Sequence, residues 1–304
     1  MHVIMAAEAL WTLDRVSLGA GRLREVSVEI PRGITAVVGW SGAGKTSLLN
    51  VLVGFERPDR GVIAAPGSVA WVPQDGGLWP HCTAREHLEI AGAAADAADA
   101  LLAAFDLGER AAARPGELSQ GEHARLNVAR ALAARAAVLV MDEPLAHVDP
   151  ARVARYWAAL REHLGARSLV FATHSPEAAL GHAEHVICLR NGCLLHAGPM
   201  GETYAHPPNP EVMECLGPGN WVTPDEAALW FGEKLREPRC FRPEQIEIEP
   251  AHISHVVVTA TTFLGSVAET ELRLVNAAAI RKFLHRPSGP HLHAGAPASL
   301  RLQE

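Results

Sequence analysis

Short apolar runs and segments of helical spacing alternate along the first two hundred residues. The apolar runs at 34–38, 138–141 and 168–172 are typical of parallel strands buried on both faces. A further strand is predicted at 68–72, and helices are predicted at 47–53, 84–108 and 120 to about 134. This alternation predicts an α/β fold with a largely parallel sheet.

Strict alternation of apolar and polar residues predicts antiparallel strands in other places. Val26, Val28 and Ile30 alternate with polar residues before the turn at 31–33, so residues 1–32 should form short strands. The runs 186–189 and 193–197 flank Asn191-Gly192, which is a strong hairpin signal.

Prolines interrupt the chain from about residue 203. One helix is expected at 224–235, with Thr223 as its cap, Pro224 at its first position and Glu226 completing a capping box. Strands are expected at 245–248, 256–261, 267–275 and 299–302. In the third of these, Thr270, Leu272 and Leu274 should share a buried face. We therefore expect an α/β domain over 1–202, a linker with a helix over 203–239, and a small all-β domain over 240–304.

Composition narrows the classes of function. Hydrophobic residues make up 48% of the 304 residues, enough for a full core. The net charge is −7 and no basic block is present, which argues against nucleic acid as the main partner. The odd number of scattered cysteines, five, indicates reduced thiols in the cytoplasm. We expect neither a signal peptide nor a membrane span, so any membrane role should act through a partner.

The stretch Gly39-Trp40-Ser41-Gly42-Ala43-Gly44-Lys45-Thr46 fits the phosphate-binding pattern G-x-x-x-x-G-K-[ST] at every fixed position. It lies between a predicted strand and a predicted helix, where backbone N–H groups and a helix N-terminus can hold an anion. Lys45 can reach the outer phosphates of a nucleotide, and Thr46 can hold a magnesium ion. A plain glycine-rich turn is the alternative, which the correct flanks on both sides disfavour.

A second strand ends in two carboxylates, Asp142 and Glu143, at the sheet edge where open α/β sheets bind ligands. Asp142 can hold Mg²⁺ through water, and Glu143 can polarise an attacking water molecule. A solvated pair of carboxylates at a strand end is the alternative, but the phosphate loop favours the catalytic interpretation.

At this point the chain resembles the ATPase subunits of ATP-binding-cassette (ABC) transporters, closely over residues 1 to about 202. Gln74 lies where that family has a magnesium-sensing glutamine, and His174 matches a histidine that contacts the γ-phosphate. The stretch 118–122, Leu-Ser-Gln-Gly-Glu, resembles the family signature, with Gln120 in place of a common glycine. The stretch 145–149 resembles the dimer-contact loop, with His147 in place of a usual serine. Ser119 and Glu122 also form a capping box, which is their structural interpretation.

The resemblance implies a P-loop cassette with a helical subdomain at about 76–134, ATP and Mg²⁺ as cofactors, and a homodimer. It implies Glu143, His174, Lys45 and Gln74 as catalytic residues and Thr46, Gln74 and Asp142 as the magnesium site. The implied nucleotide contacts are residues 39–46 together with Ser47, Asp142, Ser119, Gln120, Gly121 and Asp149. A partner chain should bring its Ser119 to the phosphates, because the helical subdomain separates Ser119 from its own phosphate loop.

Two further features depart from the family pattern. The family often stacks adenine on an aromatic residue of the first strands, and the stretch 16–21 offers none. Trp11 is a candidate replacement, with core packing as the alternative. Trp40 inside the phosphate loop is also unusual.

Other stretches resemble bacterial importers in particular. Residues 77–81 followed by 84–88 resemble the segment that lies under the membrane partner, so Trp79, Pro80 and His81 should contact a permease unless Trp79 packs locally. Residues 241–246 and 263–266 are similar to small C-terminal β-barrel modules of the TOBE or Mop type. The resemblance implies an ATPase at the cytoplasmic face of the inner membrane, with a permease and an extracytoplasmic solute-binding protein as partners.

The implied solute is an inorganic ion, either an oxyanion such as molybdate or sulfate, or ferric ion. A polyamine or other small-solute importer is the alternative. An ABC ATPase acting on nucleic acid or ribosomes should show basic patches, a long coiled coil or two cassettes, and the sequence has none of these. A third possibility is that the C-terminal barrel binds the solute and regulates the ATPase.

Overall fold

The structure is a computed structural model that describes residues 9–65, 67–275, 277, 279–287 and 292–303. The chain divides into two compact units, Met1–Met200 and Gly201–Glu304, which are described separately. Within the described residues, no helix has the length and apolar character needed to cross a lipid bilayer.

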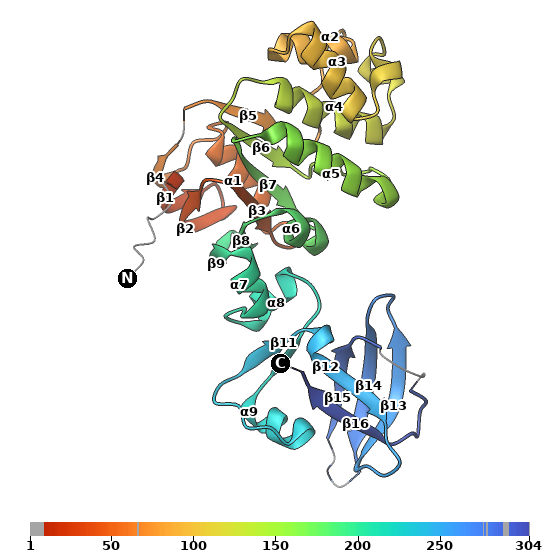
Figure 1. The fold of residues 1–304 in the computed structure, drawn as a ribbon. Coiled ribbons are helices and arrows are strands. Elements are labelled where there is room, and N and C mark those ends of the chain that lie inside the picture. Colours follow the sequence, from red (N-terminus) through yellow and green to blue (C-terminus); the bar gives the residue numbers. More distant parts are fainter. Residues whose placement is uncertain (1–8, 66, 276, 278, 288–291, 304) are drawn as a thin grey trace, which may run out of the picture. The chain divides into compact units, whose positions relative to one another are not determined.

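The centre of the first unit is a six-stranded sheet with the order β5-β6-β7-β3-β8-β9 (Figure 1). Its strands are β3 (Ile34–Val38), β5 (Val69–Val72), β6 (Val138–Asp142), β7 (Ser168–Thr173), β8 (His185–Arg190) and β9 (Cys193–Pro199). The first five strands in this order of pairing are parallel, and β9 returns antiparallel to β8. The predicted hairpin is confirmed, since Asn191 and Gly192 both have positive φ, as a tight β-turn requires.

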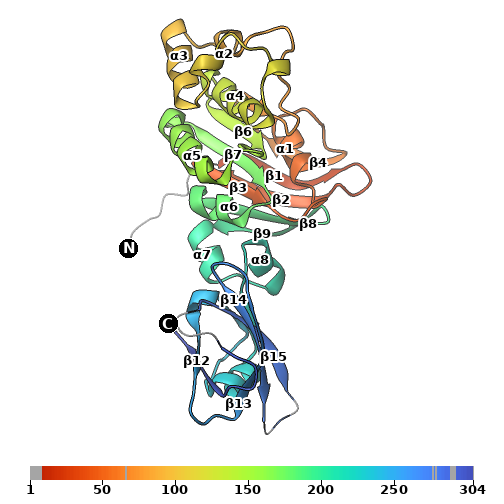
Figure 2. The ribbon, with the colours of Figure 1, turned by 90° about the vertical axis from the view of Figure 1, so that its right-hand side faces the viewer.

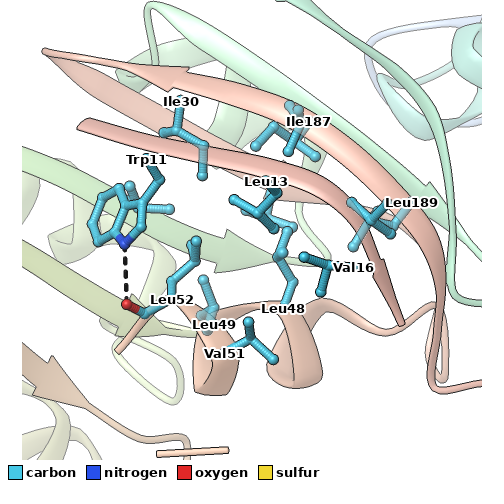
Figure 3. Packing of buried hydrophobic residues seen from close by; sticks show 14 of the residues in the cluster. Trp11, Leu13, Val16, Ile30, Leu48, Leu49, Val51, Leu52, Ile187 and Leu189 are labelled. Carbon is cyan, nitrogen blue, oxygen red and sulfur yellow. Dashed lines mark hydrogen bonds between the residues drawn. The ribbon is translucent and has the colours of Figure 1, made fainter. Parts of the chain in front are cut away.

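A second, three-stranded sheet contains β1 (Ala9–Leu18), β2 (Leu23–Pro31) and β4 (Arg60–Ala64). Its apolar face packs with α1 (Lys45–Leu52) and the inner sheet into one core (Figure 3). Trp11 is fully buried there, and its indole Nε1 donates a hydrogen bond to the Leu52 carbonyl at 3.0 Å. Core packing is therefore the correct interpretation of Trp11, and its proposed role against adenine is wrong.

The remaining helices of the first unit are α2 (Ala84–Ala91), α3 (Ala95–Ala104), α4 (Gln120–Ala133), α5 (Pro150–Leu164) and α6 (Pro176–His182). Two short 3₁₀ turns, Gly108–Arg110 and Pro115–Glu117, lie between α3 and α4. Helices α2, α3 and α4 pack together beside β5 and β6 (Figures 1 and 2). The region expected to be helical from 84 to 108 is divided, because α2 ends at Gly92 in the left-handed conformation.

The second unit begins with α7 (Met200–Ala205) and α8 (Pro210–Cys215), with α7 starting at the boundary. Its strands are β10 (Asn220–Val222), β11 (Arg239–Phe241), β12 (Ile246–Pro250), β13 (Val256–Phe263), β14 (Ala268–Leu274), β15 (Ile280–His285) and β16 (Ala298–Leu302). Strands β13, β14 and β15 form one antiparallel sheet, and β12 pairs with β16. In β14 the expected face of Thr270, Leu272 and Leu274 is buried.

Two expectations for the second unit differ from the structure. The helix expected at 224–235 is a short α-helical turn, α9 (Pro224–Glu226), followed by a π-helical turn at Ala227–Phe231. Its capping box at Thr223 is present, but the helix stops at Gly232, whose left-handed backbone ends it. The segment expected to be a linker contributes Val222, Ala227 and Trp230 to the core of the β-strands. Strands β10, β11 and β15 were not predicted.

Candidate nucleotide site

The phosphate loop connects the buried end of β3 to the first residue of α1. Gly39 and Gly44 have φ angles of 151° and 103°. A Cβ atom at Gly39 would lie 2.3 Å from the Leu189 carbonyl oxygen, and one at Gly44 would lie 2.6 Å from the Arg22 carbonyl oxygen. The loop therefore needs glycine at both positions, for conformation and for close approach to neighbouring backbone.

Lys45 folds back over this loop. Its Nζ donates hydrogen bonds to the carbonyls of Gly39 at 2.7 Å and Trp40 at 3.2 Å. Lys45 lines a cavity of about 520 Å³. The cavity is lined by Arg22, residues 41–47, Gln74, Asp142, Glu143 and His174. The predicted phosphate-binding, magnesium and catalytic side chains thus face one space, and Trp40 is not part of its lining.

Two oxygen ligands from different elements meet inside this cavity. Thr46, at the start of α1, donates from Oγ1 to Asp142 Oδ2 at the end of β6 over 2.6 Å. Asp142 is buried, and desolvation raises the pKa of its carboxyl group, while the Thr46 hydrogen bond opposes that shift. A hydroxyl and a carboxylate are ligands that Mg²⁺ prefers, and a cation here would offset the desolvation of the carboxylate.

Glu143 and His174 form the wall beside these ligands. The His174 Nδ1 lies 2.8 Å from Glu143 Oε1, and the Thr173 hydroxyl donates to Glu143 Oε2 at 3.3 Å. The Glu143 side chain is only 13% exposed whereas that of His174 is 76% exposed. The carboxylate is therefore oriented by two residues at the end of β7, and the imidazole projects into the open part of the cavity.

A second pocket lies at the start of α4. It is lined by Ser119, Gln120, Gly121, Arg125, His147, Val148, Asp149, Arg152 and Tyr156. The expected capping box is present, because Ser119 Oγ accepts from the Glu122 N–H and the Glu122 carboxylate accepts from the Ser119 N–H. Asp149 caps α5 by accepting a hydrogen bond from the Ala151 N–H at 2.9 Å. The phosphate loop does not line this pocket. Gln120 and His147 also line another cavity, to which Gln74, Asp142 and Glu143 contribute.

Sequence reasoning missed Arg22, which lines the main cavity. Its guanidinium Nη1 donates to Glu56 Oε1 at 3.0 Å, and Nη2 pairs with the other carboxylate oxygen. Arg22 and the phosphate loop are about twenty residues apart in sequence. The only signal was its position after Gly21 in the turn of the first hairpin, and that turn gives no information about distant contacts.

Trp79 combines exposure with local packing. Its ring stacks on His87 with the centroids 5.2 Å apart, and the Arg130 guanidinium lies 5.2 Å from its centroid on the ring face. The side chain is still 42% exposed. Trp79 therefore has both local packing partners and an exposed surface that a permease could contact.

The parallel sheet, the phosphate loop at its carboxyl edge and the carboxylates on the neighbouring strand define a P-loop nucleotide-binding protein. Comparison with known proteins makes this more specific. The family model described as ABC transporter matches residues 23–146. The sulfate/thiosulfate import ATP-binding protein CysA of Synechocystis is 30% identical over 90% of this chain and 86% of its own length. The Fe(3+) ions import ATP-binding protein FbpC of Pseudomonas fluorescens is 31% identical over 84% of this chain and 85% of its own length.

Solved structures agree on the fold. An ATP-binding subunit of an ABC transporter superposes with a TM-score of 0.58 at 22% identity, over 64% of this chain and 91% of that one. A dimeric ATP-binding cassette in a post-hydrolysis state with ADP and Pi superposes with a TM-score of 0.56, over 62% of this chain and 98% of that one. The chain belongs to the ABC transporter family, as one of its ATP-binding ATPase subunits.

Proposed function

We propose that this chain hydrolyses ATP to drive import of an inorganic ion through a separate membrane permease. The observation that carries the proposal is the convergence of Lys45, Thr46, Asp142, Glu143 and His174 on one cavity at the carboxyl edge of the sheet. The two relatives described above are named as importers of sulfate/thiosulfate and of ferric ion, which supports a small inorganic solute. The site would lie at the cytoplasmic face of the inner membrane.

Thr46, Asp142 and Gln74 would hold Mg²⁺, and their hydroxyl, carboxylate and amide oxygens suit a hard cation. The ion would neutralise charge on the outer phosphates of bound ATP. Lys45 adds a second positive charge, and its bonds to loop carbonyls already hold it in place. The backbone N–H groups of the loop and the N-terminus of α1 complete the anion site.

Glu143 would orient and polarise the attacking water molecule. Its partly buried carboxylate keeps one face toward the cavity, while Thr173 and His174 fix its rotation. His174 is exposed enough to contact the γ-phosphate as well. Hydrolysis would therefore depend on the positioning of the water molecule and on electrostatic stabilisation of the phosphates, and it would need no covalent intermediate.

The active form would be a head-to-tail homodimer. Ser119 and the N-terminus of α4 form an anion-binding surface separate from the phosphate loop of the same chain. A two-fold axis would bring the Ser119 surface of each chain to the open side of the partner's ATP, closing two equivalent sites. One solved relative is a dimer of this kind of cassette.

The second unit would be a regulatory module of the TOBE type. Its antiparallel strands β12 to β16 enclose their own hydrophobic core, which supports an independent role. Trp79, Pro80 and His81 would contact the permease, because all three are exposed in the loop that follows Gln74. An extracytoplasmic binding protein would deliver the solute to that permease.

The test uses purified full-length chain and the cognate permease in vesicles. The wild type should show magnesium-dependent ATP hydrolysis. The rate should fall on the order of 10²- to 10³-fold in Lys45→Ala, because the variant lacks the ammonium group that stabilises negative charge on the phosphates in the transition state. ATP-dependent uptake should then be compared for sulfate, molybdate, ferric ion and a polyamine. Hydrolysis at the wild-type rate in Lys45→Ala would contradict the active-site assignment, and uptake of the polyamine alone would contradict the inorganic solute.

A further inference from the structure

The nucleotide cavity lacks the ring on which the adenine base would be expected to stack. No Trp, Tyr or Phe occurs among its described lining residues. Val16 and Leu18, in the strand where such a ring is expected, are buried in the core. Trp11 is also committed to the core, as Figure 3 shows through its bond to Leu52. Trp40 pairs with Arg190, whose guanidinium lies 5.2 Å from the centroid of the indole ring.

Arg22 occupies the side of the cavity nearest to the hairpin between β1 and β2. Its carbonyl oxygen lies against Gly44, since a Cβ atom there would be 2.6 Å away. The neighbouring Arg24 N–H donates to the Gly192 carbonyl at 2.8 Å, and the Gly192 N–H donates to the Ala43 carbonyl at 2.9 Å. The backbone of the hairpin is thereby fixed to the phosphate loop, and the Arg22 side chain has a defined starting point.

The guanidinium plane of Arg22 is also oriented. Both terminal nitrogens pair with the two carboxylate oxygens of Glu56, and Glu56 Oε1 accepts a further hydrogen bond from Asn50 Nδ2 at 2.9 Å. A two-point pair of this kind fixes the plane of an arginine more firmly than a single contact does. The side chain is 49% exposed and lines the cavity, so a ligand bound there can reach it.

We propose that Arg22 is the base-stacking residue of this nucleotide site, with its guanidinium plane taking the place of an aromatic ring against the purine. This inference rests on the proposed ATPase function. Catalytic side chains from Gln74, Glu143 and His174 line the same cavity, which assigns the γ-phosphate to their part of it. Arg22 comes from a different element, the β1–β2 hairpin. An arginine plane stacks on π-systems, and Glu56 both neutralises its charge and holds its orientation.

A phosphate contact is the competing role for Arg22, and the two roles require different properties of the side chain. Stacking requires a flat group, which lysine lacks and tyrosine has. A phosphate contact requires positive charge, which lysine has and tyrosine lacks. The distinction can therefore be measured with three substitutions at one position and two ligands.

The experiment measures equilibrium binding of ATP and of inorganic triphosphate to full-length protein by calorimetry, in the presence of Mg²⁺. Arg22→Ala and Arg22→Lys should weaken ATP binding about 5- to 150-fold, the range measured for loss of one base-stacking side chain, and leave triphosphate binding within about twofold. Arg22→Tyr should keep ATP binding within about threefold of wild type. Arg24→Ala is the matched control, because Arg24 lies two residues further on in β2, donates to the Gly21 carbonyl and does not line the cavity.

The proposal would be overturned, and the phosphate role assigned, if Arg22→Lys kept its ATP affinity while Arg22→Tyr lost it. The same conclusion would follow if Arg22→Ala weakened the binding of triphosphate as much as the binding of ATP. Unchanged ATP binding in Arg22→Ala would overturn it as well. Failure of the underlying function looks different, because wild-type protein would then not bind ATP, or Lys45→Ala would bind it equally well. Far-ultraviolet circular dichroism and thermal unfolding of each variant exclude loss of fold as the cause.

Discussion

At the scale of single residues, the backbone of Glu143 shows how the site is held. Glu143 has a φ of 51°, a conformation that non-glycine residues adopt at some cost. Its N–H donates to the Ala172 carbonyl at 3.0 Å, which continues the ladder between β6 and β7 past the end of the strand. This conformation turns the carboxylate toward Thr173 and His174. The sequence placed Glu143 at a strand end but contained no sign of this left-handed turn.

Glu143→Gln should bind ATP with near wild-type affinity and nearly stop hydrolysis. The amide keeps the size and hydrogen-bonding reach of the carboxylate but lacks its negative charge, so it cannot act as a general base, a loss of about 10²- to 10⁴-fold. Single-turnover hydrolysis together with ATP binding by calorimetry measures both effects. Rapid turnover in this variant would move the base elsewhere, with His174 as the next candidate.

Trp11→Phe should destabilise the first unit by about 1–3 kcal/mol, because it leaves the Leu52 carbonyl without its buried donor. Since the ring does not line the nucleotide cavity, ATP affinity at 25 °C should stay close to that of the wild type. Urea denaturation and ATP calorimetry on the same preparations test this. A loss of ATP affinity with unchanged stability would indicate that Trp11 contacts adenine after all.

At the scale of elements, local signals predicted local structure well. The buried strands, the Asn191-Gly192 hairpin and the Ser119 capping box all depend on neighbours in sequence, and all three are present. Helix ends were less predictable. The helices around 84–108 and 224–235 both stop early at glycines that adopt a left-handed backbone, Gly92 and Gly232. Glycine permits that conformation without requiring it, so the pattern alone could not place the ends.

His87 links α2 to the loop that follows Gln74 and should make the fold sensitive to acid. Its Nε2 accepts from the Trp79 N–H at 2.8 Å, and its Nδ1 lies 2.7 Å from the Thr83 carbonyl, a pattern that needs the neutral ring. Burial lowers the pKa of His87, so the unfolded chain takes up more protons as the pH falls. The stabilisation is complete above the unfolded pKa of about 6.5 and is lost as the pH falls below it.

The urea midpoint of the wild type should therefore decrease from pH 7.5 to pH 5.5. This decrease should be smaller in His87→Gln, whose amide can accept from Trp79 but cannot be protonated in this range. Burial also lowers the pKa values of His182 and His285, so part of the acid effect should remain in the variant. An equal decrease in both proteins would show that His87 does not contribute.

At the scale of the whole molecule, contacts between distant parts of the chain were the hardest to foresee. The phosphate loop and the two carboxylates were identifiable because each follows a recognisable strand. Arg22 and its partner Glu56 were not, because they are 34 residues apart and no local pattern joins them. The second unit shows the same limit, since Val222, Ala227 and Trp230 belong to a core whose other members follow residue 240.

In the proposed dimer two chains complete each ATP site, and mixing two inactive variants tests this arrangement. Ser119→Arg should bind ATP as a monomer but fail to hydrolyse it, because its cation and bulk oppose dimer closure at the partner's site. Glu143→Gln should close without hydrolysis. In a mixed dimer, the ATP bound by the Ser119→Arg chain meets an intact Glu143 of its own chain and an intact Ser119 of the other.

Equimolar mixing should therefore restore hydrolysis, with about a quarter of the wild-type rate as the upper limit. That limit holds for random pairing, in which half of the dimers are mixed and each has one intact site, and the arginine at the other site lowers the value. Initial rates of phosphate release, recorded for each variant alone and for the mixture, give the answer. Normal hydrolysis by Ser119→Arg alone, or a mixture no more active than its components, would contradict the shared site.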